Sequence, residues 1–168
     1  PALVFLHYFG GAAKSWQWLI EKLSDDYDCL ALDLPGFGGS EPLVNLSIKM
    51  MAENVIEQVK LQFPDRTFIL VGHSMGGKIA MEVACRLKTD ENLQQLIRLA
   101  PSPPTIERMP DKEKTRMLIH PDETQALVTV DKGTIRKLPG ERLQMAVETQ
   151  LAADNRTWRW WIEEGMNE

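Results

Sequence analysis

The sequence predicts an α/β fold: a parallel sheet of about four strands with flanking helices, followed by a helical second part. Short apolar runs alternate with helical patterns as far as Ala100, and none of them alternates polar with apolar residues. Such runs suit strands buried on both faces of a parallel sheet. After Ala100, prolines interrupt the pattern and only helical periodicity follows. This order predicts right-handed crossovers in a core of residues 1–104 and a helical region of residues 105–168.

The individual elements follow from local pattern. The expected strands are Ala2–Leu6, Cys29–Leu32, Phe68–Val71 and Leu96–Ala100. Between them, apolar residues recur at helical spacing in three stretches, which begin at Trp16, Ile48 and Ile79. In the second part the candidate helices are Met109–Ile119, Pro121–Leu127, Glu141–Ala153 and Trp158–Glu164.

Composition and charge restrict the class of protein. The chain has 168 residues, of which 43% are hydrophobic and 26% charged, as expected for a folded chain with a buried core. Its net charge of −5 argues against binding to nucleic acid or to a membrane surface. Cys29 and Cys85 are too few for a disulfide framework, and no secretory signal is visible, so a cytoplasmic location is expected. No pattern indicates a metal site or a cofactor.

One motif carries chemistry. Gly72-His73-Ser74-Met75-Gly76 matches the pattern G-x-S-x-G, and it lies between an expected strand and an expected helix. A serine on such a turn projects its hydroxyl from the carboxyl edge of the sheet. Glycines flank it because side chains there would crowd the turn. The alternative is a glycine-rich turn without chemistry.

Two further segments stand at matching places. His7-Tyr8-Phe9-Gly10-Gly11 follows the first expected strand, and the segment from Asp33 to Ser40, DLPGFGGS, follows the second. Together with the Ser74 turn, these segments resemble the α/β-hydrolase fold family. The resemblance covers residues 2–104 in order and spacing, and the helical part resembles that family's cap. Asp33 ends the expected strand, and Gly36 and Gly38 permit a tight turn, which favours a structural role over a phosphate-binding loop.

The resemblance implies roles for particular residues. Ser74 matches the nucleophile, and the backbone N–H groups of Phe9 and Met75 match the oxyanion hole. His7 matches a histidine that packs beneath the first loop and is not the base. The family more often has glycine where Tyr8 stands, which predicts a reshaped loop. Independently of the resemblance, Trp160 belongs to a cluster of tryptophans near the end of the chain, and with Tyr8 and His73 it is a candidate residue of the substrate pocket.

A base for Ser74 is missing from the expected position. The family order is serine, then a carboxylate, then histidine, and His120 is the only histidine after Ser74. His120 ends a candidate helix, which favours a structural role. The family also has strands before the first expected strand and after the cap, and the latter carry the acid and the histidine. We therefore expect the chain to be an internal piece of a longer protein, with exposed sheet edges that could self-associate.

Three interpretations of function remain open. The first is a serine hydrolase that acts on a small ester or related acyl substrate, with its base outside these residues. The second is a ligand-binding protein without catalysis on the same scaffold, and the third is an inactive fragment. Serine at the turn disfavours the aspartate-dependent members of the family. The cap, not the fold, determines the substrate.

Overall fold

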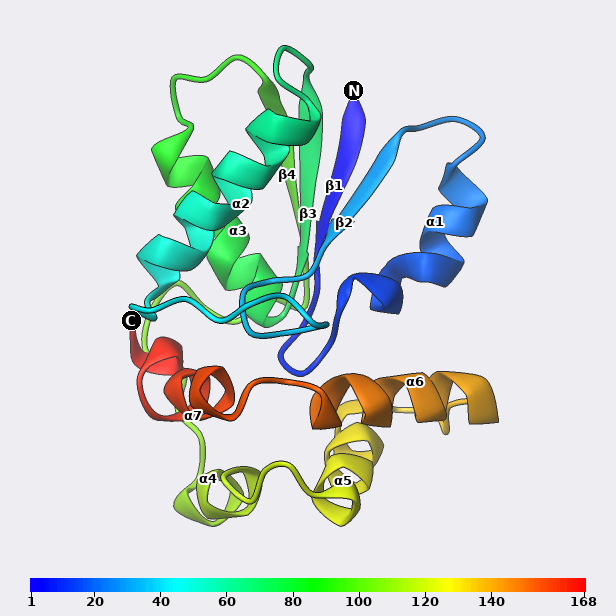
Figure 1. The fold of residues 1–168 in the computed structure, drawn as a ribbon, viewed down its shortest axis with the longest axis vertical. Helices are drawn as coiled ribbons and strands as arrows, with labels where there is room; N and C mark the ends of the chain where they lie inside the picture. Colours follow the sequence, from blue (N-terminus) through cyan, green and yellow to red (C-terminus); the bar gives the residue numbers. More distant parts are fainter.

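A computed structural model describes all residues from 1 to 168 as a layered α/β molecule (Figure 1). Its strands are β1 (Ala2–Leu6), β2 (Cys29–Leu32), β3 (Phe68–His73) and β4 (Leu93–Leu99). They form one parallel sheet in the order β2-β1-β3-β4. The predicted parallel sheet is therefore confirmed, and all four strands end at the same edge.

β1 lies in the middle of the sheet because it is apolar on both faces. Val4 and Leu6 belong to the large cluster beneath helices α2 (Ile48–Gln62) and α3 (Met75–Arg86). Leu3 and Phe5 face the opposite side, where they meet Trp16 of the 3-10 turn Ala13–Trp16 and the neighbouring α1 (Gln17–Leu23). Helices thus cover both faces, as Figure 1 shows.

The outer strands differ from the expectation. β4 begins at Leu93 and not at Leu96, and Ile97 and Leu99 are 36% and 42% exposed. Gln94 and Gln95 interrupt the apolar run, which is typical of an edge strand with one open side. Every residue of β2, the other outer strand, is only half-buried. The prediction that all four strands are buried on both faces is therefore wrong for β2 and β4.

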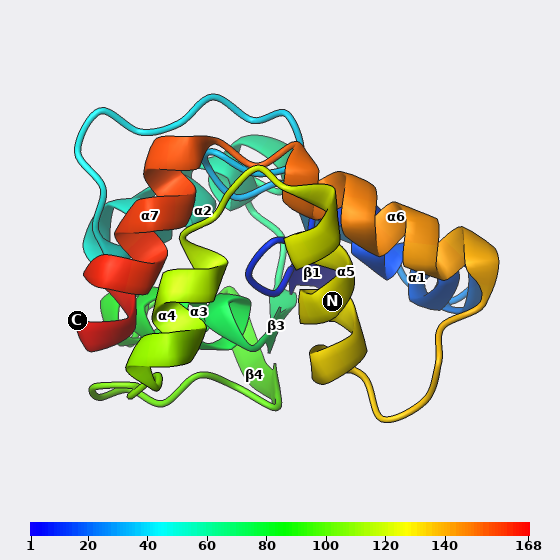
Figure 2. The same cartoon turned by 90° about the horizontal axis from the view of Figure 1, so that it is seen from below.

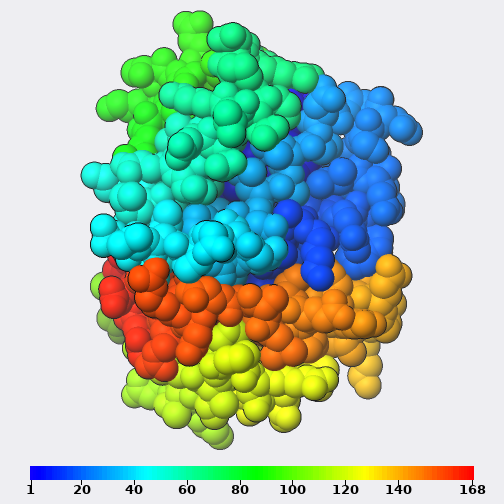
Figure 3. All heavy atoms as spheres, viewed as in Figure 1, coloured from blue at the N-terminus to red at the C-terminus, as the bar shows by residue number.

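The second part of the chain is helical, as predicted. It contains α4 (Asp111–Met117), α5 (Glu123–Gly133), α6 (Gly140–Leu151), α7 (Asn155–Glu163) and the 3-10 turn Gly165–Asn167. These helices form a layer across the carboxyl ends of the strands, and the view from below in Figure 2 shows it in front of the sheet. In Figure 3 the layer meets the core along a continuous boundary.

Helix starts were set by polar caps that the apolar pattern did not reveal. The Asp122 carboxylate accepts a hydrogen bond from Gln125 N at 2.8 Å, so α5 begins at Glu123. α5 extends six residues beyond the predicted end at Leu127. Asp154 accepts from Thr157 N at 2.8 Å, and α7 begins three residues before the predicted start at Trp158.

One buried lysine ties the helical layer to the core. Lys78 lies in α3, and its Nζ donates to the carbonyl oxygens of Met166 at 3.0 Å and Thr105 at 3.3 Å. Burial lowers the pKa of Lys78, and the carboxylates of Glu107 and Glu168 oppose this shift. The two carbonyls bracket the helical layer, since Thr105 precedes its helices and Met166 follows them.

Candidate active site

The turn at Ser74 has a backbone conformation that only a tightly built site maintains. Ser74 has φ 51° and ψ −116°, a left-handed conformation that is rare outside glycine. A Cβ on Gly72 would lie 2.4 Å from the Gly76 carbonyl oxygen. A Cβ on Gly76 would lie 2.5 Å from the carbonyl oxygens of Leu6 and His7. The spacing of the motif therefore reflects close contact between backbones, as predicted.

Backbone hydrogen bonds hold this turn against β4 and α3. Ser74 N donates to Leu99 O at 3.1 Å, and Ser74 O accepts from Gly77 N at 2.9 Å and Ser102 N at 3.0 Å. The Ser74 hydroxyl itself forms no hydrogen bond with another protein group. Strained conformations that the surroundings over-determine are concentrated at functional sites. The backbone thus fixes the position of the Ser74 hydroxyl, and this hydroxyl has no hydrogen-bond partner in the protein.

The two expected N–H donors lie in different elements. Met75 is the first residue of α3, so its N–H has no acceptor within that helix. Phe9 N donates to no protein acceptor. The Phe9 ring packs on Trp158 of α7, with 4.1 Å between ring centroids, so the helical layer supports the loop. Neither N–H group therefore has a hydrogen-bond acceptor within the protein.

His7 is a structural residue, as predicted. It is fully buried, its Nδ1–H donates to Tyr8 O at 2.8 Å, and its Nε2 accepts from Leu34 N at 3.1 Å. Burial lowers the pKa of His7 to about 4, although Tyr8 O and the Asp33 carboxylate oppose the shift. The neutral ring therefore joins the loop after β1, through Tyr8, to the loop after β2, through Leu34.

Asp33 and Gly38 also shape the loops. The Asp33 carboxylate accepts from Ala13 N at 2.6 Å. Gly38 has φ 60°, and a Cβ there would lie 1.9 Å from Asp33 Oδ1. The carboxylate thus anchors the chain after the first loop and fills the space that glycine leaves. The structural role predicted for these residues is confirmed.

A cleft of about 440 Å³ opens beside Ser74, between the sheet edge and helices α5 and α6. Fifteen residues line it: Tyr8, Phe9, Ser15, Trp18, His73, Ser74, Thr129, Val130, Gly133, Thr134, Leu138, Arg142, Met145, Ala146 and Gln150. The structure therefore brings Tyr8, Phe9 and His73 together with Ser74. Burial raises the pKa of Tyr8, although the neighbouring hydroxyls of Ser15 and Thr149 oppose the shift, and burial lowers the pKa of His73. Both side chains are uncharged near pH 7.

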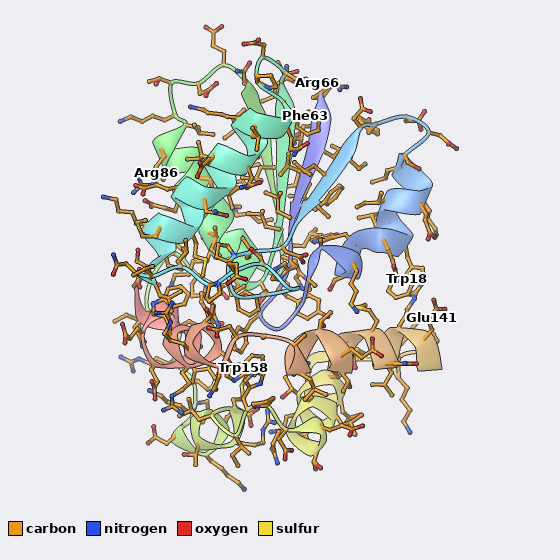
Figure 4. All side chains as sticks on the ribbon, viewed as in Figure 1. Trp18, Phe63, Arg66, Arg86, Glu141 and Trp158 are labelled. Carbon is orange, nitrogen blue, oxygen red and sulfur yellow. The ribbon has the colours of Figure 1, made fainter.

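Trp160 does not line this cleft. It is 5% exposed and belongs to the main core, where its ring lies 6.1 Å from that of Trp161 and close to Gly165. Trp158 also lies inside this core, where Figure 4 shows it near the first loop. α7 turns its tryptophans toward the core, and the roof of the cleft comes from α5 and α6.

Sequence reasoning did not single out the polar lining of the roof. Arg142, Met145, Ala146 and Gln150 lie at helical spacing on one face of α6. Gln150 is 3% exposed and its Oε1 has no hydrogen-bond partner. In the sequence these four residues share one helix face, but only the docking of α6 over the sheet edge shows that this face lines the cleft.

His120, the remaining candidate base, is committed to packing. Its ring stacks on Trp158 at 4.0 Å with an interplanar angle of 5°, and Nε2 lies 3.0 Å from Ala153 O. Burial lowers its pKa. His120 is absent from the lining of the Ser74 cleft, so the structural role favoured by the sequence agrees with its contacts.

No cluster of three or more possible metal ligands occurs in the chain. None of its helices has the length and apolar character needed to span a bilayer.

Comparison with curated proteins identifies esterases among the relatives. The chain is 38% identical over 101 residues to the pimeloyl-[acyl-carrier protein] methyl ester esterases of Proteus mirabilis and Citrobacter koseri. The match covers 60% of this chain but only 36% and 37% of those enzymes. A relative from Haemophilus influenzae, 35% identical over 96 residues, bears the provisional name 2-succinyl-6-hydroxy-2,4-cyclohexadiene-1-carboxylate synthase. That match covers 56% of this chain and 38% of the relative.

Solved structures extend the likeness to the whole chain. An esterase from Exiguobacterium antarcticum superposes with a TM-score of 0.86 at 18% identity, over 99% of this chain and 66% of that one. MenH from S. aureus gives a TM-score of 0.68 at 20% identity, again over 99% of this chain and 66% of the other. A family model of the alpha/beta hydrolase fold matches residues 1–160, and the chain therefore belongs to the α/β-hydrolase fold family.

Proposed function

We propose that the protein is a serine hydrolase that cleaves a small ester or related acyl substrate, with Ser74 as nucleophile. The observation that carries the proposal is the turn between β3 and α3. There Ser74 has a positive φ, and its hydroxyl, which has no protein partner, lines the cleft. Esterases among the relatives support the reaction class. Because this chain covers only part of those relatives, the proposal concerns the full-length protein.

The reaction follows from these groups. Ser74 Oγ attacks the carbonyl carbon, and a histidine outside these residues, oriented by a carboxylate, accepts the Ser74 proton. The N–H groups of Phe9 and Met75 donate to the negative oxygen of the tetrahedral intermediate, where one such donor is typically worth ~3 to 4 kcal/mol. The ester C–O bond then breaks, and the alcohol leaves with the proton from the histidine. Water next attacks the acyl carbonyl carbon and gives a proton to the histidine. The bond between Ser74 Oγ and the acyl carbon then breaks, and the histidine returns that proton to Ser74 Oγ as the carboxylic acid leaves.

Residues 105–168 serve as the cap in this proposal. Val130, Leu138 and Met145 supply an apolar wall for the acyl chain, opposite the Tyr8 side of the cleft. A cleft with mostly apolar walls and a few polar groups is the usual form of a small-molecule site.

A p-nitrophenyl ester series tests the proposal in the product of the complete gene. We expect turnover that Ser74→Ala reduces by at least about 10³-fold, since the nucleophile and its acyl intermediate are lost. Ser102→Ala is the matched control, because Ser102 contacts the turn through its backbone and does not line the cleft. Equal rates in Ser74→Ala and the unmodified protein would contradict the proposal.

The alternative is ligand binding without catalysis. It is favoured by one observation, that no base contacts the Ser74 hydroxyl within these residues. It predicts that an acyl ligand binds and is recovered intact, with the same affinity in Ser74→Ala. Ester turnover that depends on Ser74 excludes it.

A further inference from the structure

The cleft beside Ser74 is lined by apolar and neutral polar side chains, with Arg142 as the exception. Arg142 is the only permanently charged residue among those that line it. It forms no ion pair and donates no hydrogen bond to a protein group, although the adjacent Glu141 is an exposed carboxylate. An arginine presents five N–H donors in a rigid fork that fits a carboxylate. Arg142 therefore carries an unused recognition surface on the lining of the cleft.

The guanidinium group is held in place by an aromatic ring. It lies over the indole of Trp18, with 4.8 Å between the Arg142 Cζ and the ring centroid. Trp18 comes from α1 and also lines the cleft, and Figure 4 shows it directed from α1 toward the start of α6. Stacking on an aromatic face orients an arginine while leaving its N–H edge free. The contact joins the core to the helical layer.

Arg142 lies far from the loop after β1, which contains Phe9 and Gly10. Gln150, at the other end of the same face of α6, touches that loop, because a Cβ on Gly10 would lie 2.7 Å from Gln150 Cγ. The separation of eight positions from Arg142 to Gln150 corresponds to roughly 12 Å along a helix. Met145 and Ala146 lie between them and also line the cleft. The cleft thus has a reacting end, an apolar stretch and a cationic end.

We propose that Arg142, stacked on Trp18, binds a carboxylate at the end of the substrate remote from the scissile bond. The substrate class is then half-esters of dicarboxylic acids, whose chain lies along α6 while the ester carbonyl reaches Ser74. The inference rests on the proposed function for its reaction and on the lining of the cleft for its specificity. Because Arg142 is exposed, the preference for an anionic substrate falls as ionic strength rises.

The kinetic test compares monomethyl and dimethyl esters of the linear dicarboxylic acids from succinate to sebacate, using the full-length protein. We expect kcat/KM to favour the half-ester by on the order of tenfold for at least one chain length, and Arg142→Gln to remove this preference through KM. Arg142→Glu should reverse the preference. Arg136→Gln is the matched control, because Arg136 is also exposed and without an ion pair but does not line the cleft.

A binding test separates this inference from the proposed function. Calorimetric titration of Ser74→Ala with the same half-esters should give binding that Arg142→Gln weakens on the order of tenfold, while Arg136→Gln leaves it unchanged. If Arg142-dependent binding occurs but the unmodified protein hydrolyses no ester, the inference stands and the hydrolase proposal is wrong. If esters are hydrolysed through Ser74 without an Arg142-dependent preference for half-esters, the inference is wrong and the hydrolase proposal stands.

Discussion

At the scale of single residues, the backbone conformation or the contacts of each key side chain in the site restrict what that residue can do. Ser74 is held in a strained conformation, His7 is kept neutral by burial, and His120 is used in packing. The sequence motif predicted the place of Ser74, and the neighbouring glycines explain it. It could not reveal Arg142 or Gln150, since only the docking of α6 on the sheet edge turns their face toward Ser74.

The strain at Ser74 predicts a stability order among its variants. Glycine adopts φ 51° without the penalty that any Cβ carries. We expect the free energy of unfolding of Ser74→Gly to exceed that of Ser74→Ala by about 1 kcal/mol, measured by urea denaturation. Both variants lack the hydroxyl, so their difference reports the backbone alone. A Ser74→Ala protein as stable as Ser74→Gly would show that the turn is relaxed.

The buried His7 predicts a pH dependence of stability. Its pKa is about 4 in the folded chain and 6.5 for an ordinary solvated histidine, so the unfolded chain binds the proton more tightly. The stabilisation by neutral His7 is complete above pH 6.5 and is lost as the pH falls through 4. It amounts to about 3 kcal/mol.

Denaturation at several pH values checks this expectation. The difference in free energy of unfolding between the unmodified protein and His7→Gln should shrink by about 3 kcal/mol from neutral pH to pH 4. His120→Gln is the comparison, because His120 is only half-buried and should show a smaller change. A constant difference for His7→Gln would mean that the ring is solvated.

At the scale of elements, strand positions were easier to predict than helix boundaries. β1 and β2 have the predicted bounds because their apolar runs end abruptly at polar or loop residues. β4 was misplaced because Gln94 and Gln95 are tolerated on an open edge. The starts of α5 and α7 depend on Asp122 and Asp154, whose capping bonds do not follow from the periodicity of apolar residues.

The turn between β3 and α3 has no room for a side chain at Gly76, the second glycine of the Gly72–Gly76 motif. Gly76→Ala would press a methyl group onto the Leu6 and His7 carbonyl oxygens, and we expect the free energy of unfolding to fall by about 2–3 kcal/mol. Gly140→Ala, at the start of α6, meets nothing within 4 Å and should change stability by less than about 0.5 kcal/mol. Thermal or urea denaturation distinguishes the two. Equal effects would contradict the close packing described for this turn.

At the scale of the whole molecule, the sequence pattern predicted the parallel sheet and the helical second part. The cleft between them could not be predicted, because it depends on how α5 and α6 settle over Ser74. Trp160 was assigned to the pocket from its clustering with other tryptophans, whereas α7 buries it in the core. The boundary after residue 104, the cytoplasmic location and self-association through sheet edges stay predictions.

The central claim is that Ser74 is the nucleophile of the full-length protein, activated by a histidine other than those in this chain. Treatment with a fluorophosphonate followed by intact mass measurement tests it most directly. We predict one adduct on the peptide that contains Ser74, absent in Ser74→Ala and retained in a His120→Gln variant that remains folded. An adduct that persists in Ser74→Ala, or that disappears in folded His120→Gln, would contradict the account.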